Sequence, residues 1–88
     1  MTEKPDLTPE YCERAVVGAT PYPSRFQPGT GDTTTLFDLG VVNATAAGHF
    51  VRAVKSRITP WMIDTHLIPS SKNTTVQEAS DSVMNNAV

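Results

Sequence analysis

Asp64 and His66 are the one carboxylate and imidazole pair in the chain that lie two residues apart. On a β-strand their side chains would point to the same side, where such a pair could bind a metal ion or transfer a proton. A metal site needs at least one more ligand, and nothing in the spacing connects the pair to Asp38, His49 or Cys12. We therefore expect no metal site and no catalytic residue, and interpret Asp64 and His66 as part of an exposed polar strand face.

Two further features could take part in chemistry but lack the residues that would accompany it. Cys12 falls on the apolar face of a predicted helix, where a free cysteine behaves as a small hydrophobic residue, and no base lies close to it in the sequence. The stretch from Gly29 to Asp32 has two glycines, but neither the lysine of a phosphate-binding loop nor the third glycine of a dinucleotide-binding loop. We expect no cofactor, no small-molecule substrate and no enzymatic activity.

The composition narrows the classes of partner. The chain has 88 residues, of which 39% are hydrophobic, and a net charge of −2. Without an excess of basic residues, nucleic acid is not an expected partner. The sequence has neither a basic leader followed by an apolar segment nor an apolar run long enough to cross a bilayer. We expect a protein that is neither secreted nor inserted in a membrane.

The small size of the chain predicts a dependence on other subunits. A chain of 88 residues buries a smaller share of its surface than a typical domain does. The single cysteine excludes an internal disulfide, and no cluster of cysteine and histidine offers a structural zinc site. Small scaffolds usually need such a staple, so oligomerisation or docking on a partner is expected to complete the core.

The central element is predicted within residues 41–68, the longest segment with an apolar periodicity. Five apolar residues recur there at the spacing of one helix face: Ala47, Phe50, Val51, Val54 and Ile58. Asn43 or Thr45 can cap the start of this helix, and Arg52 and Lys55 fall mostly off the apolar face. The spacing therefore predicts a long amphipathic helix with one face in the core.

Shorter elements are predicted on both sides of this helix. Thr8 before a proline is a helix start and predicts a short helix over residues 9–17. The β-branched and apolar residues of 33–42 predict a short buried strand, and residues 61–68 fit a strand slightly better than a short helix. Thr75 opens a capping box for a weak helix in the polar tail. Together these elements predict a small single domain of the α+β class.

Residues 19–35 are rich in proline and glycine and have no periodic pattern. Residues that precede proline avoid the helical region, which favours an extended path. We predict an arm, along which Tyr22, Arg25 and Phe26 are of types suited to a pocket of a neighbouring protein. The sequence leaves the alternative, a surface loop folded back on its own domain, equally open.

The chain is accordingly divided into four parts. They are a polar lead with a short helix over 1–18, the arm over 19–35, a strand-helix-strand core over 36–69, and the polar tail over 70–88. Other protein subunits are the expected partners. The residues predicted to contact them are Tyr22, Arg25, Phe26, Arg52, Lys55 and Trp61.

These features favour a non-enzymatic structural or interaction subunit of a large assembly. Our first hypothesis is a minor virion protein, such as a cement or adaptor protein of a bacteriophage capsid or tail, located in the virion or the cytoplasm. The alternative is a small soluble inhibitor or regulator that binds one host enzyme, and a third hypothesis is an accessory subunit of a multi-subunit enzyme. A preformed surface on a monomer would favour the inhibitor, whereas a chain that is poorly ordered alone would favour the assembly subunit.

Overall fold

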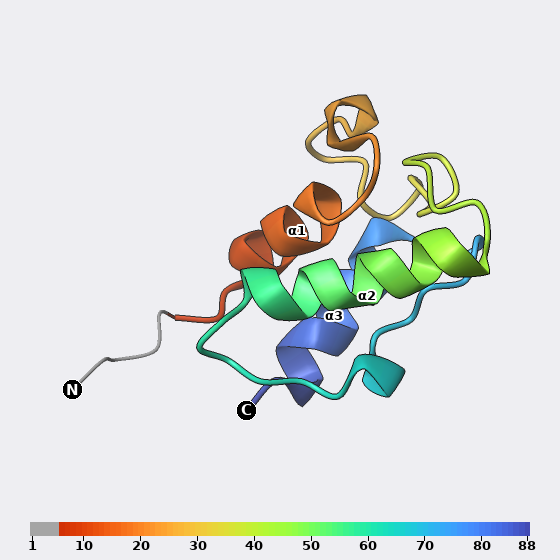
Figure 1. Ribbon diagram of the computed structural model, residues 1–88. Helices are drawn as coiled ribbons and strands as arrows, with labels where there is room; N and C mark the ends of the chain where they lie inside the picture. Colours follow the sequence, from red (N-terminus) through yellow and green to blue (C-terminus); the bar gives the residue numbers. More distant parts are fainter. Residues whose placement is uncertain (1–5) are drawn as a thin grey trace.

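The computed structural model describes residues 6–88, which form a helical domain (Figure 1). The elements are the α-helices α1 (Pro9–Gly18), α2 (Ala44–Arg57) and α3 (Val76–Asn86) and the 3-10 helices η1 (Pro23–Arg25) and η2 (Thr65–Leu67). The described residues contain no β-strand, so the predicted α+β class is wrong. Residues 1–5 of the predicted polar lead lie outside the described part of the chain.

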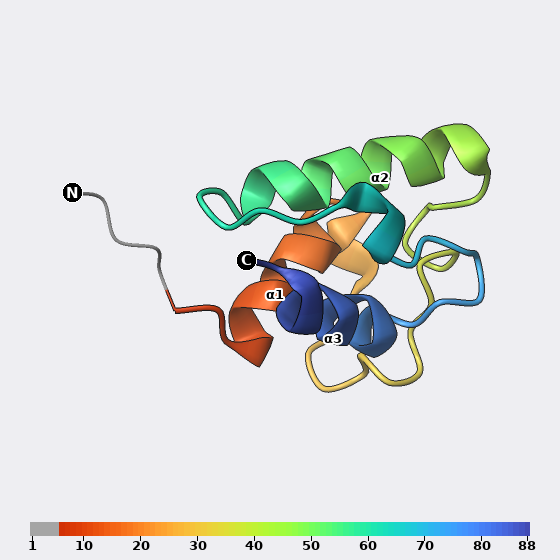
Figure 2. The ribbon, with the colours of Figure 1, turned by 90° about the horizontal axis from the view of Figure 1, so that it is seen from below.

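The helices form two layers. Helix α1 packs mainly against α3, and Figure 2 shows α2 lying over this pair. Within residues 6–88, no helix combines the length and the apolar character that crossing a bilayer requires. The core therefore lies between α2 on one side and α1 with α3 on the other.

Each α-helix begins at a cap that the sequence predicts. The side-chain oxygens of Thr8, Asn43 and Thr75 accept a hydrogen bond from the backbone N–H three residues later, at 3.1, 2.8 and 3.1 Å respectively. These bonds satisfy N–H groups that have no partner within the first turn of a helix. The three helix starts are therefore encoded locally, and their prediction is confirmed.

Helix α2 buries the face that its apolar spacing predicts. Phe50, Val54 and Ile58 are fully buried, and Ala47 and Val51 pack partly buried against the core. The other two helices contribute the buried residues Cys12, Ala15, Val16, Val76, Ala79 and Val83. The prediction of the core face of α2 is confirmed.

Helix α3, which the sequence predicts as a weak helix in the polar tail, contributes buried residues to the core. Val76, Ala79 and Val83 have no exposed surface, because α1 packs along the helix and covers them. A short helix needs cover from other elements to be stable in water. The cover comes from the same chain.

Residues 33–42 form a turn and not the predicted strand. The backbone N–H of Asp38 donates to the Thr35 hydroxyl and the N–H of Thr35 donates to the Asp38 carboxylate, both at 3.3 Å, as in a capping box. Gly40 then takes a positive φ of 103°. The turn places Leu36 and Leu39 in the core, and only an isolated antiparallel bridge joins Thr35 to Thr75.

Residues 61–68 also differ from the predicted strand. Met62 exchanges two backbone hydrogen bonds with Val88, each of 2.8 Å, which is one pair and not a ladder. After it, Asp64 caps the 3-10 helix η2. The buried side chains of Ile63 and Ile68 hold this segment against the core.

Residues 19–35 are a surface loop folded back on the domain, the second of the two alternatives that the sequence left open. The backbone N–H of Tyr22 donates to the carbonyl of Leu39 at 3.0 Å, and the carbonyl of Gly31 accepts from the N–H of Gln77 at 2.8 Å. Thr20 is buried. The loop is therefore tied both to the turn at 33–42 and to the start of α3.

Candidate functional site

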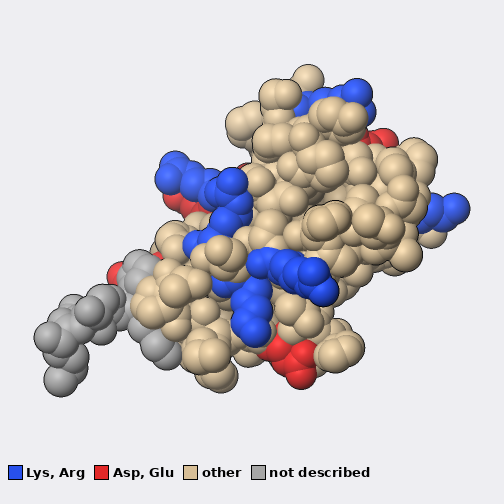
Figure 3. Space-filling model, in the orientation of Figure 1, with Lys and Arg blue, Asp and Glu red and all other residues tan. Residues whose placement is uncertain are grey.

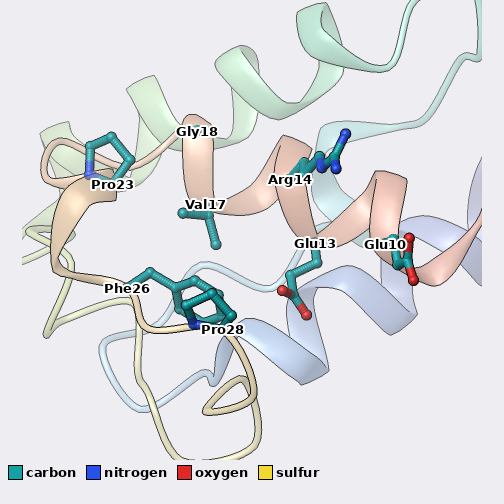
Figure 4. Close-up of a pocket in the computed structure, with 8 residues that line it drawn as sticks. All are labelled: Glu10, Glu13, Arg14, Val17, Gly18, Pro23, Phe26 and Pro28. Carbon is teal, nitrogen blue, oxygen red and sulfur yellow. The ribbon is translucent and has the colours of Figure 1, made fainter.

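A groove lies between α1 and the loop that follows it, with a volume of about 460 Å³ (Figure 4). Its lining combines apolar and charged side chains from two segments: Glu10, Glu13, Arg14, Val17, Gly18, Pro23, Phe26 and Pro28. Concave sites of this kind, mostly apolar with a few placed polar groups, are where proteins usually bind ligands or partner segments. The groove is therefore the candidate functional site of the described residues.

The helical side of the groove follows from the spacing of its residues. Glu10, Glu13 and Val17 lie three and four residues apart on α1, so they follow one side of the helix. In Figure 4, Glu13 and Val17 point from α1 toward Phe26 and Pro28. Along one face of α1, the acidic side chains of Glu10 and Glu13 are thus followed by the apolar side chain of Val17.

The opposite side of the groove is formed by the 3-10 helix η1 and the residues after it. The N–H of Phe26 donates to the carbonyl of Pro23 at 3.1 Å, which turns the chain at the end of η1. Phe26 is partly buried against the core, while Pro23 and Pro28 are exposed. Two proline rings and one aromatic ring therefore give this side a stiff apolar surface.

The carboxylates of Glu10 and Glu13 form no ion pair with the residues that the structure describes. Figure 4 shows Arg14 pointing to the side of α1 opposite to Glu13. The ion pair seen within residues 6–88 is that of Asp64 with His66, so Glu10 and Glu13 have no cationic partner among them. Glu13 is partly buried, and its carboxylate lies beside Gly31, where an added Cβ would be 3.7 Å from Oε2. The groove thus presents carboxylates next to apolar surface.

The structure separates the six residues that the sequence predicts as partner contacts. Tyr22 and Arg25 come together, with the guanidinium carbon 4.3 Å from the ring centroid, a cation–π contact. Phe26 lines the groove. Arg52 and Lys55 are exposed on α2, and Trp61 is partly buried against the core.

Helix α2 carries a second charged surface. It contains Arg52, Lys55 and Arg57 and no carboxylate. On the face seen in Figure 3, basic atoms gather over the end of this helix and acidic atoms lie toward the edges. The Arg57 guanidinium lies over Gly18 at the end of α1, where a cation complements the helix dipole. A Cβ at position 18 would lie 2.7 Å from the guanidinium carbon, a clash that the flexible Arg57 side chain can relieve by moving.

Asp64 and His66 meet in the structure, on a 3-10 turn and not on a strand. The Asp64 Oδ1 atom accepts from the backbone N–H of His66 and lies 2.9 Å from its Nδ1 atom. The side chains are 61% and 92% exposed respectively, so water competes with the pair. Asp64 therefore serves to cap the turn that begins η2.

We predict that the Asp64 carboxyl titrates below its ordinary pKa. The backbone N–H of His66 is the main cause and the imidazole is the second, because both stabilise the carboxylate. A lowered pKa in the folded state gives stability that is present above the unfolded pKa of about 3.9 and is lost as the pH falls through the folded value. Side-chain NMR titration measures this pKa directly. The His66→Gln variant is expected to keep most of the shift, and a full return to the ordinary pKa would assign the cause to the imidazole.

The remaining residues considered for chemistry lie apart from one another. Cys12 is fully buried, and burial together with the charge of Asp81 raises the pKa of its thiol, which keeps it protonated and unreactive. Within residues 6–88, histidine, cysteine and acidic residues form no group of three that could hold a metal ion. Gly29 lies in a turn and has a positive φ of 89°.

Of the residues that line the groove, the sequence predicts Phe26 alone as a partner contact. The signal for the helical side was present, since Glu10, Glu13 and Val17 have the spacing of one helix face. No local pattern could show that Pro28 would face this helix, because the approach depends on how the loop folds back. Searches against models of protein families, curated proteins and solved structures find no match.

Proposed function

We propose that this chain is a non-enzymatic interaction subunit that docks a segment of another protein in the groove between α1 and the loop at 23–28. The observation that carries the proposal is the combination of an apolar wall with carboxylates that have no cationic partner in the described residues. Protein interfaces commonly centre on such an apolar depression, with polar groups at its rim.

The larger setting stays a prediction from the sequence. A minor virion component, such as a cement or adaptor protein of a bacteriophage or viral particle, would use the groove to attach to a neighbouring subunit. The corresponding locations are the virion or the cytoplasm.

A second candidate function is an inhibitor or regulator that binds one host enzyme. It is favoured by the core, to which all three α-helices and the connecting segments of this one chain contribute buried residues. A surface built on such a core is preformed, which lowers the entropy cost of binding. Size-exclusion chromatography with circular dichroism separates the two candidates. A folded monomer favours the inhibitor, and a chain that folds only on association favours the assembly subunit.

Site-specific photo-cross-linking tests the docking proposal. We place p-benzoylphenylalanine at Pro28, an exposed residue at the groove, and in a control at Met84, an exposed residue of α3 outside it. In cells that make the protein, irradiation is expected to join the Pro28 variant to one discrete protein and to give no such product with the Met84 variant. Equal products at both positions, or none at Pro28, would contradict docking in the groove.

A further inference from the structure

We propose that the groove receives a lysine or arginine side chain of the partner protein, with the cationic end at Glu13 and the aliphatic part against Val17, Phe26 and Pro28. The inference rests on the proposed function, because it names the chemistry of the segment that docks in the groove.

The shape and charge of the groove match this kind of side chain. Lysine and arginine combine an apolar stem with a cationic end, and they bury the stem along apolar surface while the end stays at a polar rim. In Figure 4, the apolar side chains of Val17 and Phe26 lie at one end of the groove and Glu13 lies beside them. The Phe26 ring adds a face to which a cation is attracted.

Other ligand classes fit the groove less well. A purely apolar side chain would cover the carboxylate of Glu13, a partly buried residue, without giving it a partner, which costs desolvation free energy. An anionic side chain would meet Glu10 and Glu13, and although Arg14 also lines the groove, its guanidinium points away from Glu13. Charge complementarity therefore selects a cation.

Four of the basic residues that the structure describes are engaged or lie away from the groove. Arg25 lies over the ring of Tyr22, and the guanidinium of Arg57 lies over Gly18. Arg52 and Lys55 are exposed on α2, which lies on the other side of α1 from Glu13 in Figure 4. Neither could reach the groove of its own molecule, but both could enter the groove of a second copy, so self-association is included in the test.

The test is an NMR titration of the full, ¹⁵N-labelled chain with two matched probes. One is N-acetyl-arginine methylamide, and the other is N-acetyl-citrulline methylamide, which has nearly the same shape without the charge. We expect the arginine probe to shift the amide signals of Glu13, Val17 and Phe26 in a saturable way. We expect the citrulline probe to bind up to about fivefold more weakly, the factor that corresponds to about 1 kcal/mol, the upper end for an exposed ion pair.

Two variants with the same change in net charge locate the cation. Glu13→Gln is expected to reduce the affinity for the arginine probe to that of the citrulline probe, a loss of up to about fivefold. Asp64→Asn, which removes a carboxylate on the distant turn before η2, is expected to leave it unchanged. An equal loss in both variants would mean that overall charge, and not Glu13, attracts the probe, and would overturn the proposal.

The remaining outcomes separate this inference from the docking proposal. Equal binding of both probes, or shifts outside the groove, would overturn the preference for a cation, while a cross-link at Pro28 would still support docking. Sedimentation velocity of the unmodified chain tests the second copy. If the chain self-associates, Glu13→Gln and Arg52→Glu should each abolish the association, and Glu13→Arg combined with Arg52→Glu should restore it. This result would assign the groove to another copy of this chain and overturn a different protein as its occupant.

Discussion

Replacing Phe50 with alanine is expected to lower the free energy of unfolding by about 3–5 kcal/mol. Phe50 is the largest of the fully buried side chains and lies in the middle of the core face of α2. Removing the ring takes away its transfer free energy and leaves a cavity between the two helix layers. Small domains have about 5–15 kcal/mol in total, so the variant retains little stability.

Thermal unfolding followed by circular dichroism measures this effect. A loss of this size corresponds to a fall in Tm of more than about 10 °C, at about 4–8 °C for each kcal/mol. The control is Arg52→Ala on the exposed side of the same helix, for which we expect a cost below about 1 kcal/mol. Equal Tm values for Phe50→Ala and the unaltered chain would mean that α2 does not bury this face.

Replacing Gly40 with alanine is expected to cost about 2–5 kcal/mol. Its φ of 103° is one that residues with a side chain rarely adopt, and this contributes about 1–2 kcal/mol. A Cβ at Gly40 would also lie 2.6 Å from Cδ2 of Tyr22 and 2.9 Å from Cβ of Pro21, and such overpacking typically costs about 1–3 kcal/mol. Urea unfolding gives the free energy directly.

Gly29→Ala separates the two contributions. Gly29 has a similar φ of 89°, but a Cβ there would meet no atom within 4 Å. We therefore expect Gly29→Ala to cost about 1–2 kcal/mol, the conformational part alone. In a Tyr22→Ala background, the cost of Gly40→Ala should become smaller, because the nearest clash is removed. The same loss at both glycines would show that the loop moves away from Gly40 without cost.

The helices could be predicted from the sequence because their signals are local. Thr8, Asn43 and Thr75 each act within one turn of their own helix, and the apolar residues of α2 repeat at the period of a helix. Such signals depend only on neighbouring residues. They therefore predict the helices without knowledge of how the rest of the chain folds.

The strands could not be predicted reliably, because a strand exists only when another strand pairs with it. Residues 33–42 have a composition typical of strands, but the chain supplies one bridging pair at Thr35 and Thr75. The competing local signal was also present. Thr35 and Asp38 have the spacing of a capping box, and Gly40 follows at the position where a turn needs a positive φ.

The sequence by itself determined the three helix starts, the buried face of α2 and the line of Glu10, Glu13 and Val17 along α1. Only the tertiary structure decided that the loop folds back, that α3 belongs to the core, and that Phe26 and Pro28 face α1 to close the groove. The physical reason is the range of the interactions. Capping and helical periodicity act over one or two turns of a helix. A groove is lined by residues that lie apart in the sequence, and only the packing of the whole core brings them together.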